Sequence, residues 1–97
     1  MNPCGLAWGD LKGCLGNSRI HPVRNLPADQ QTAFLLAPPE QIVSVFLRMH
    51  PKHKGCRKDL IAKLRRSSEA TPEGQIRVRM ASPLGKEILR LSHANHG

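Results

Sequence analysis

The residues best suited to chemistry in this 97-residue chain are cations that gather in one short segment. Residues 48–66 hold eight lysines and arginines against a single acid, Asp59. A surface of this sign can neutralise phosphates and release their counterions, which gives affinity without reading a base sequence. Solubility alone would be served by mixed signs. The charge pattern therefore predicts a polyanion, in the first place nucleic acid, as the partner.

We expect phosphate contacts from this segment and from two arginines of a later strand. The predicted contacts are Arg48, Lys52, Lys54, Lys58, Lys63, Arg65, Arg66, Arg77 and Arg79. No Phe, Tyr or Trp lies within residues 48–66, so unpaired bases would find no stacking platform there. Duplex DNA or structured RNA is the expected partner. The alternatives are a protein–protein interaction module that docks its basic helix on an acidic partner, and a chain that folds poorly and has no evolved function.

A second candidate site is a possible metal centre. His50, His53 and Cys56 have the spacing H-x2-H-x2-C, and all three are zinc-ligand types. However, Lys52 and Lys54 interleave with the histidines and would repel a cation, and the paired spacing of common structural sites is absent. We therefore expect no metal and no cofactor.

Catalytic motifs are weak. Gly85-Lys86 resembles the end of a phosphate-binding loop, but Met80 stands where the first glycine should be and Glu87 where Ser or Thr should be. No carboxylate pair and no Ser/His/Asp arrangement is recognisable. We predict no catalytic residue and no enzymatic activity.

The cysteines and the chain start bear on the compartment. Three cysteines, Cys4, Cys14 and Cys56, are an odd and low number that does not suggest a disulfide framework. The chain start shows no secretory signal, and no apolar run approaches the ~20 residues of a membrane span. We expect an intracellular, reducing setting and no membrane.

The elements that must position these residues divide near Pro38-Pro39. Residues 1–39 carry a net charge of +1 and residues 40–97 a net charge of +7, giving +8 in total. Glycines at 5, 9, 13 and 16 predict an irregular segment over 1–25. Residues 26–92 are expected to form a small helical basic domain, and 93–97 a frayed tail.

Two helices should carry the basic segment. In residues 40–49, Ile42, Val45, Phe46 and Met49 fall at i, i+3, i+4 and i+7, with Pro39 and Glu40 suited to the first turn. Residues 56–66 form an amphipathic helix whose polar face is almost wholly cationic. Pro51 and Gly55 indicate a turn between them. A further short helix is expected from Pro27 to Leu36.

The rest of the chain mixes strand and helix signals. Residues 75–80 alternate strictly, which predicts a half-buried strand with Arg77 and Arg79 outward. Ser82 and Pro83 then suit the start of a helix over 83–92. A second strand over 86–91, completing a hairpin, is the competing interpretation. The fold class predicted is mainly α with a small β element.

Residues 40–92 resemble a winged helix-turn-helix DNA-binding domain. The stretch from Phe46 to Gly55 looks like a helix with its short connection, 57–64 looks like the next helix, and 77–89 looks like a wing strand entering a C-terminal helix. This resemblance implies a compact helix-turn-helix-like fold, possibly winged, and a DNA-binding regulator. Either the separate recognition helix is missing, or residues 71–81 form it in place of the strand. A basic structural component of a ribonucleoprotein is the runner-up.

Overall fold

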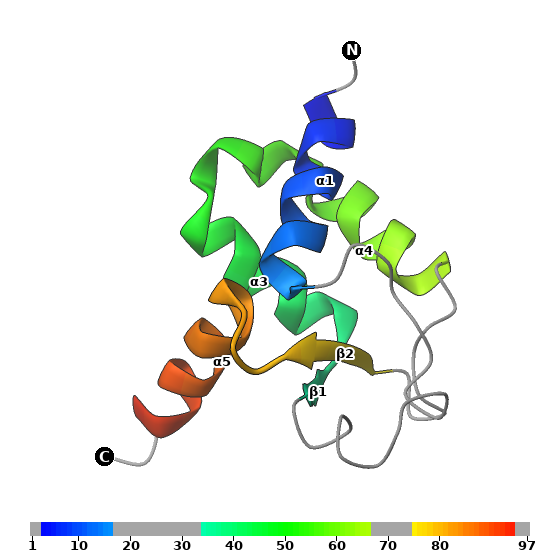
Figure 1. Ribbon diagram of the computed structural model, residues 1–97. Helices are drawn as coiled ribbons and strands as arrows, with labels where there is room; N and C mark the ends of the chain where they lie inside the picture. Colours follow the sequence, from blue (N-terminus) through cyan, green and yellow to red (C-terminus); the bar gives the residue numbers. More distant parts are fainter. Residues whose placement is uncertain (1–2, 17–33, 67–74, 95–97) are drawn as a thin grey trace.

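A computed structural model describes residues 3–16, 34–66 and 75–94 (Figure 1). These residues are mainly helical with a small antiparallel sheet, as the predicted fold class requires. The elements in chain order are α1 (Pro3–Leu15), β1 (Phe34–Ala37), α3 (Pro39–Met49), the 3-10 helix η2 (Pro51–Cys56), α4 (Arg57–Arg66), β2 (Ile76–Arg79) and α5 (Pro83–Ala94). Expectations for 17–33, 67–74 and 95–97 lie outside the described residues.

The two helices of the basic segment form where their apolar spacing predicts. On α3, Ile42, Val45 and Phe46 are buried, and Pro39 occupies the first turn. On α4, Leu60 and Leu64 are fully buried. The predicted turn between them is the 3-10 helix η2, whose last residue is Cys56. The two helices therefore pack together by their apolar stripes and leave their polar faces outward.

The prediction of an irregular segment over residues 1–25 is wrong for residues 3–15, which form helix α1. Its buried residues repeat every four positions, at Ala7, Leu11 and Leu15. Its glycines repeat in the same way on the exposed face, at Gly5, Gly9 and Gly13. The helix ends at Gly16, whose φ of 80° is a left-handed conformation that suits glycine. Burial of one face therefore outweighs the low helix propensity of the other.

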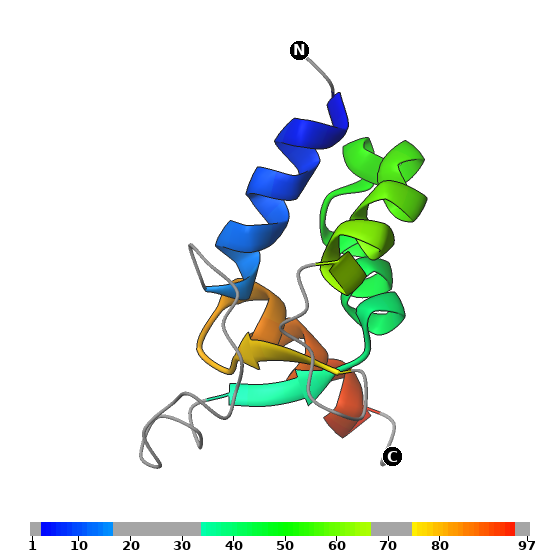
Figure 2. The same ribbon diagram turned by 90° about the vertical axis from the view of Figure 1, so that its right-hand side faces the viewer.

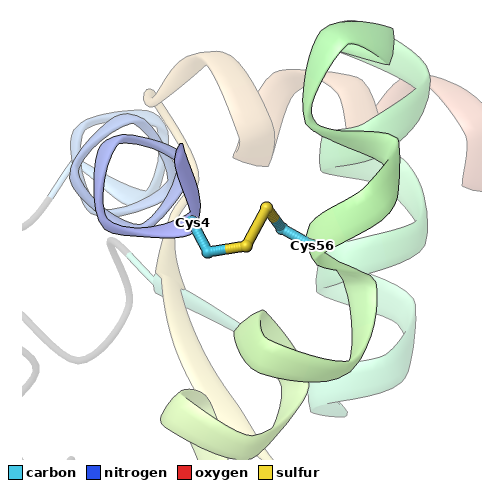
Figure 3. Close-up of a disulfide and its surroundings, with 2 residues drawn as sticks. All are labelled: Cys4 and Cys56. Atoms are coloured by element: carbon cyan, nitrogen blue, oxygen red, sulfur yellow. A yellow bond between two sulfur atoms is a disulfide. The ribbon is translucent and has the colours of Figure 1, made fainter. Parts of the chain in front are cut away.

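Helix α1 packs against η2, α4 and α5 (Figures 1 and 2). A disulfide joins Cys4 of α1 to Cys56 at the end of η2, with 5.5 Å between their Cα atoms (Figure 3). The expectation that the cysteines form no disulfide is therefore wrong for this pair. Cys14, the third cysteine, has a free thiol and is half-buried.

The helix predicted from Pro27 to Leu36 is also wrong at its end, because residues 34–36 belong to strand β1. This strand pairs antiparallel with β2, and the register sets Phe34 opposite Arg79 and Ala37 opposite Ile76. The partner strand lies about forty residues further along the chain, so the pairing is a tertiary choice that overrides local periodicity. The strand over 76–79 confirms the β prediction there and excludes a recognition helix through those residues.

Helix α5 confirms the predicted C-terminal helix over 83–92 and continues to Ala94, against the expected fraying of residues 93 and 94. The competing strand over 86–91 is wrong. Ser82 acts as the N-cap, since its hydroxyl accepts a hydrogen bond from the backbone N–H of Gly85 at 2.9 Å. The same hydroxyl donates to the carbonyl oxygen of Arg79 at 2.6 Å. Among the described residues, no helix is long and apolar enough to cross a membrane.

Two glycine substitutions should have opposite effects on stability. A Cβ at Gly85 would overlap the carbonyl oxygen of Arg79, where α5 meets the end of β2. We expect Gly85→Ala to lower the free energy of unfolding by about 1–3 kcal/mol. A Cβ at Gly9, in the middle of α1, meets nothing within 4 Å, so Gly9→Ala should raise it by about 0.5–1 kcal/mol. Denaturant titrations measure both; stabilisation by Gly85→Ala would contradict the close approach of α5 to β2.

Candidate nucleic-acid interface

The cations of residues 48–66 form a surface over the end of α3, η2 and α4. Seven of the eight are exposed, and Lys63 is half-buried. We call these seven the basic surface: Arg48, Lys52, Lys54, Arg57, Lys58, Arg65 and Arg66. The apolar stripes of α3 and α4 position it, because burying Phe46, Leu60 and Leu64 turns the polar faces of both helices to solvent.

Two arginines of this surface are held against α3. Arg57 donates a hydrogen bond to the hydroxyl of Ser44 at 3.0 Å. Arg65 forms an ion pair with Glu40. Exposed pairs of this kind contribute little to stability, but they align the cations of α4 along α3. They also make Arg65 a weaker candidate for phosphate contact than the three exposed lysines, because a phosphate would compete with Glu40.

The fold brings an aromatic residue beside the basic surface. Trp8 of α1 is half-buried, and the ammonium nitrogens of Lys12 and Lys63 each lie 5.7 Å from its ring centroid. Such distances are typical of cation–π contacts. Trp8 is absent from the predicted site because it lies far from residues 48–66 in the sequence and only the fold brings it to Lys63. Trp8 and Lys12 are four residues apart, which places both on one face of a helix. The glycines of this segment do not predict that helix.

The two arginines of β2, Arg77 and Arg79, differ in their exposure to solvent. Arg77 is 2% exposed, so it is not available to an external phosphate, and its prediction as a contact is wrong. Its guanidinium lies 4.7 Å from the centroid of the Phe34 ring. Arg79 is exposed, and it lies 4.8 Å from the same ring and donates to the carbonyl of Gly16. These contacts tie β2 to β1 and to the end of α1.

The histidines face α1. His53 is buried, and its Nε2 lies 2.8 Å from a carboxylate oxygen of Asp10. The His53 ring stacks on the Phe46 ring, with 5.7 Å between the two centroids. His50 approaches the thiol of Cys14 at 3.5 Å. Cys56, the third residue of the suspected metal motif, is engaged in the disulfide. Within the described ranges, no three His, Cys, Asp or Glu side chains gather in a way that could hold a metal ion.

The contact between Asp10 and His53 should make stability sensitive to acid. Hydrogen bonding to His53 lowers the pKa of Asp10 below its ordinary value of 3.8; burial opposes this, and the charges of His53, Lys52 and His50 add to it. The stabilisation is therefore complete above the ordinary pKa and is lost as the pH falls through the lowered, folded-state value.

We expect Asp10→Asn to lower the melting temperature at neutral pH. The difference from the parent should shrink in strong acid, where the parent carboxyl is also protonated. Thermal melts of both proteins across a pH series measure this. An equal difference at every pH would mean that packing of residue 10, rather than its charge, stabilises the fold.

Comparison with protein-family models found no match, and neither did searches of curated proteins and of solved structures.

Proposed function

We propose that this chain is a non-catalytic nucleic-acid-binding protein that contacts phosphates with the basic surface. The observation that carries the proposal is the one-sided charge of residues 48–66: eight cations against Asp59, with seven of the cations exposed. A folded surface of this sign lowers its own electrostatic self-repulsion when it neutralises phosphates, and it gains free energy from released counterions.

Within this class, a DNA-binding regulator similar to winged helix-turn-helix proteins is the sharper version. The succession of α3, the short connection η2 and α4 with its cationic exposed face supports it. A basic component of a ribonucleoprotein is the other version. Competition between DNA and RNA of matched sequence separates the two, because a regulator prefers DNA and discriminates among sequences.

The proposal places the chain inside the cell, where nucleic acid is met, although the Cys4–Cys56 disulfide is typical of an oxidising compartment. In a reducing compartment Cys4 and Cys56 would be thiols rather than a disulfide. Alkylation in intact cells before lysis therefore reports the compartment. Modification of both cysteines is the expected result, and protection of both would place the chain in an oxidising one.

The test is binding of a labelled oligonucleotide by fluorescence anisotropy. The parent is compared with a triple variant, Lys52→Gln, Lys54→Gln and Lys58→Gln, which removes three exposed cations from η2 and α4. The matched control is Lys86→Gln, an exposed lysine of α5 outside the basic surface. The triple variant should bind more weakly by a similar factor on every sequence, and the control should match the parent.

Two outcomes would overturn the proposal. One is equal affinity of the triple variant and the parent. The other is no binding of the parent to any nucleic acid, together with tight binding to an acidic polypeptide such as polyglutamate, which would favour the protein-docking alternative.

A further inference from the structure

Trp8 of α1 lies beside Lys63, one of the cations of α4. It packs against the core and is half-buried. Trp8 and Lys12, four residues apart, share the flank of α1 that faces α4, since Lys63 reaches the same ring. The opposite flank of α1 carries Asp10 and Cys14, which contact the histidines. The aromatic flank is thus the one that continues the basic surface.

The cations continue from Trp8 along α4. Lys63 lies against the ring, and Arg66 follows three residues later, on the same side of the helix and exposed. An indole ring offers a π face on which any base can stack. The ammonium groups of Lys12 and Lys63 lie over this ring, so a stacked base would displace them towards the phosphates on either side of it. Duplex DNA keeps its bases stacked on one another and cannot use such a ring without being opened.

We infer that the basic surface binds single-stranded nucleic acid, with Trp8 as the platform for one unpaired base and Lys12 and Lys63 as its flanking phosphate contacts. This inference rests on the proposed function and names its substrate class. It replaces the expectation of duplex or structured RNA, which depended on the absence of an aromatic residue among the cations. The fold supplies that residue from α1, and Trp8 precedes Lys63 by 55 positions in the sequence.

One acid lies close to this platform. Asp59 is exposed and precedes Lys63 by four residues, so both project from the same side of α4. Its charge opposes an approaching phosphate. Asp59→Asn should therefore tighten binding to single strands by a few-fold, and the gain should fade in high salt as the charge is screened.

The first experiment uses the parent alone. The chain has one Trp and no Tyr, so its tryptophan fluorescence reports on residue 8 and nothing else. Titration with single-stranded oligothymidylate should quench and saturate this emission. A duplex of equal length should bind more weakly and leave the emission nearly unchanged. Tight duplex binding with unquenched emission would overturn the inference.

The second experiment uses variants that keep the fold. Trp8→Phe retains an aromatic face, whereas Trp8→Leu retains apolar packing without one; circular dichroism first shows that both are folded. We expect Trp8→Leu to lose about 5- to 150-fold in affinity for the single strand and Trp8→Phe to lose less, with duplex affinity unchanged in both.

The two proposals fail separately. If Trp8→Leu binds single strands as the parent does, while the triple lysine variant loses affinity, the stacking inference is wrong and the proposed function stands. If the parent binds neither single strands nor duplex, both are wrong.

Discussion

Replacing Phe46 with alanine is expected to remove most of the folding free energy of this chain. Phe46 is fully buried on α3, and its ring contacts those of His50 and His53 at 4.9 and 5.7 Å. Truncating a buried phenylalanine costs about 3–5 kcal/mol, whereas small domains are stable by about 5–15 kcal/mol in total. Thermal melts followed by circular dichroism should show a large drop in the midpoint for Phe46→Ala.

Phe46→Leu is the matched control, because it keeps most of the apolar volume. Its loss should be about 1.5 kcal/mol, well below that of alanine. A Phe46→Ala melt that coincides with the parent would mean that α3 and η2 do not pack around this ring.

Removing the Cys4–Cys56 disulfide should have an effect of similar size. The bond joins residues separated by 52 positions, and in the chain-entropy account a closed loop of that length stabilises a fold by about 4 kcal/mol. Denaturant titrations of the parent with and without reductant, and of the double variant Cys4→Ser with Cys56→Ser, should show this loss. The double variant should be insensitive to reductant.

Cys14→Ser separates the disulfide from general effects of reductant. Burial, and to a smaller extent Asp10, raise the pKa of the Cys14 thiol, so it stays protonated at neutral pH. This variant should keep the parent's sensitivity to reductant. Oxidised parent protein that shows three alkylatable thiols under denaturing conditions, instead of one, would contradict the disulfide.

The sequence was sufficient for the elements whose signals are local. The apolar spacing of α3, the serine and proline at the start of α5, and the alternation of 76–79 each arise within a few residues, and the structure contains all three elements. The spacing of apolar residues in an amphipathic helix or strand follows from the geometry of that element, and its apolar face needs only some apolar neighbour to cover it. Such elements can be predicted without knowing what that neighbour is.

The missed elements depend on partners distant in sequence. Helix α1 is glycine-rich, and its stability comes from burying Leu11 and Leu15 against the rest of the fold. Strand β1 forms because β2 lies beside it, with Leu35 opposite Val78. The disulfide follows from the position of α1, which the glycine-rich sequence of residues 1–25 does not predict.

The same distinction applies to the candidate site. Exposure of Lys58, Arg65 and Arg66 follows from the local amphipathicity of α4 and is correctly predicted, whereas Lys63 is half-buried. Burial of Arg77 is not predicted, because alternation along a strand assumes that one face meets solvent, whereas Arg77 is 2% exposed and its guanidinium lies over the Phe34 ring. The position of Trp8 beside Lys63 required the fold itself.

The central claim, that the basic surface binds phosphates, is tested most directly by the salt dependence of the parent's affinity. Five to seven phosphate contacts predict that log K falls with log[salt] at a slope of about −5 to −6 on duplex and about −3.5 to −5 on single strands. The triple lysine variant should flatten the duplex slope by about three. A slope near zero on both nucleic acids, or one unchanged in the variant, would contradict the account.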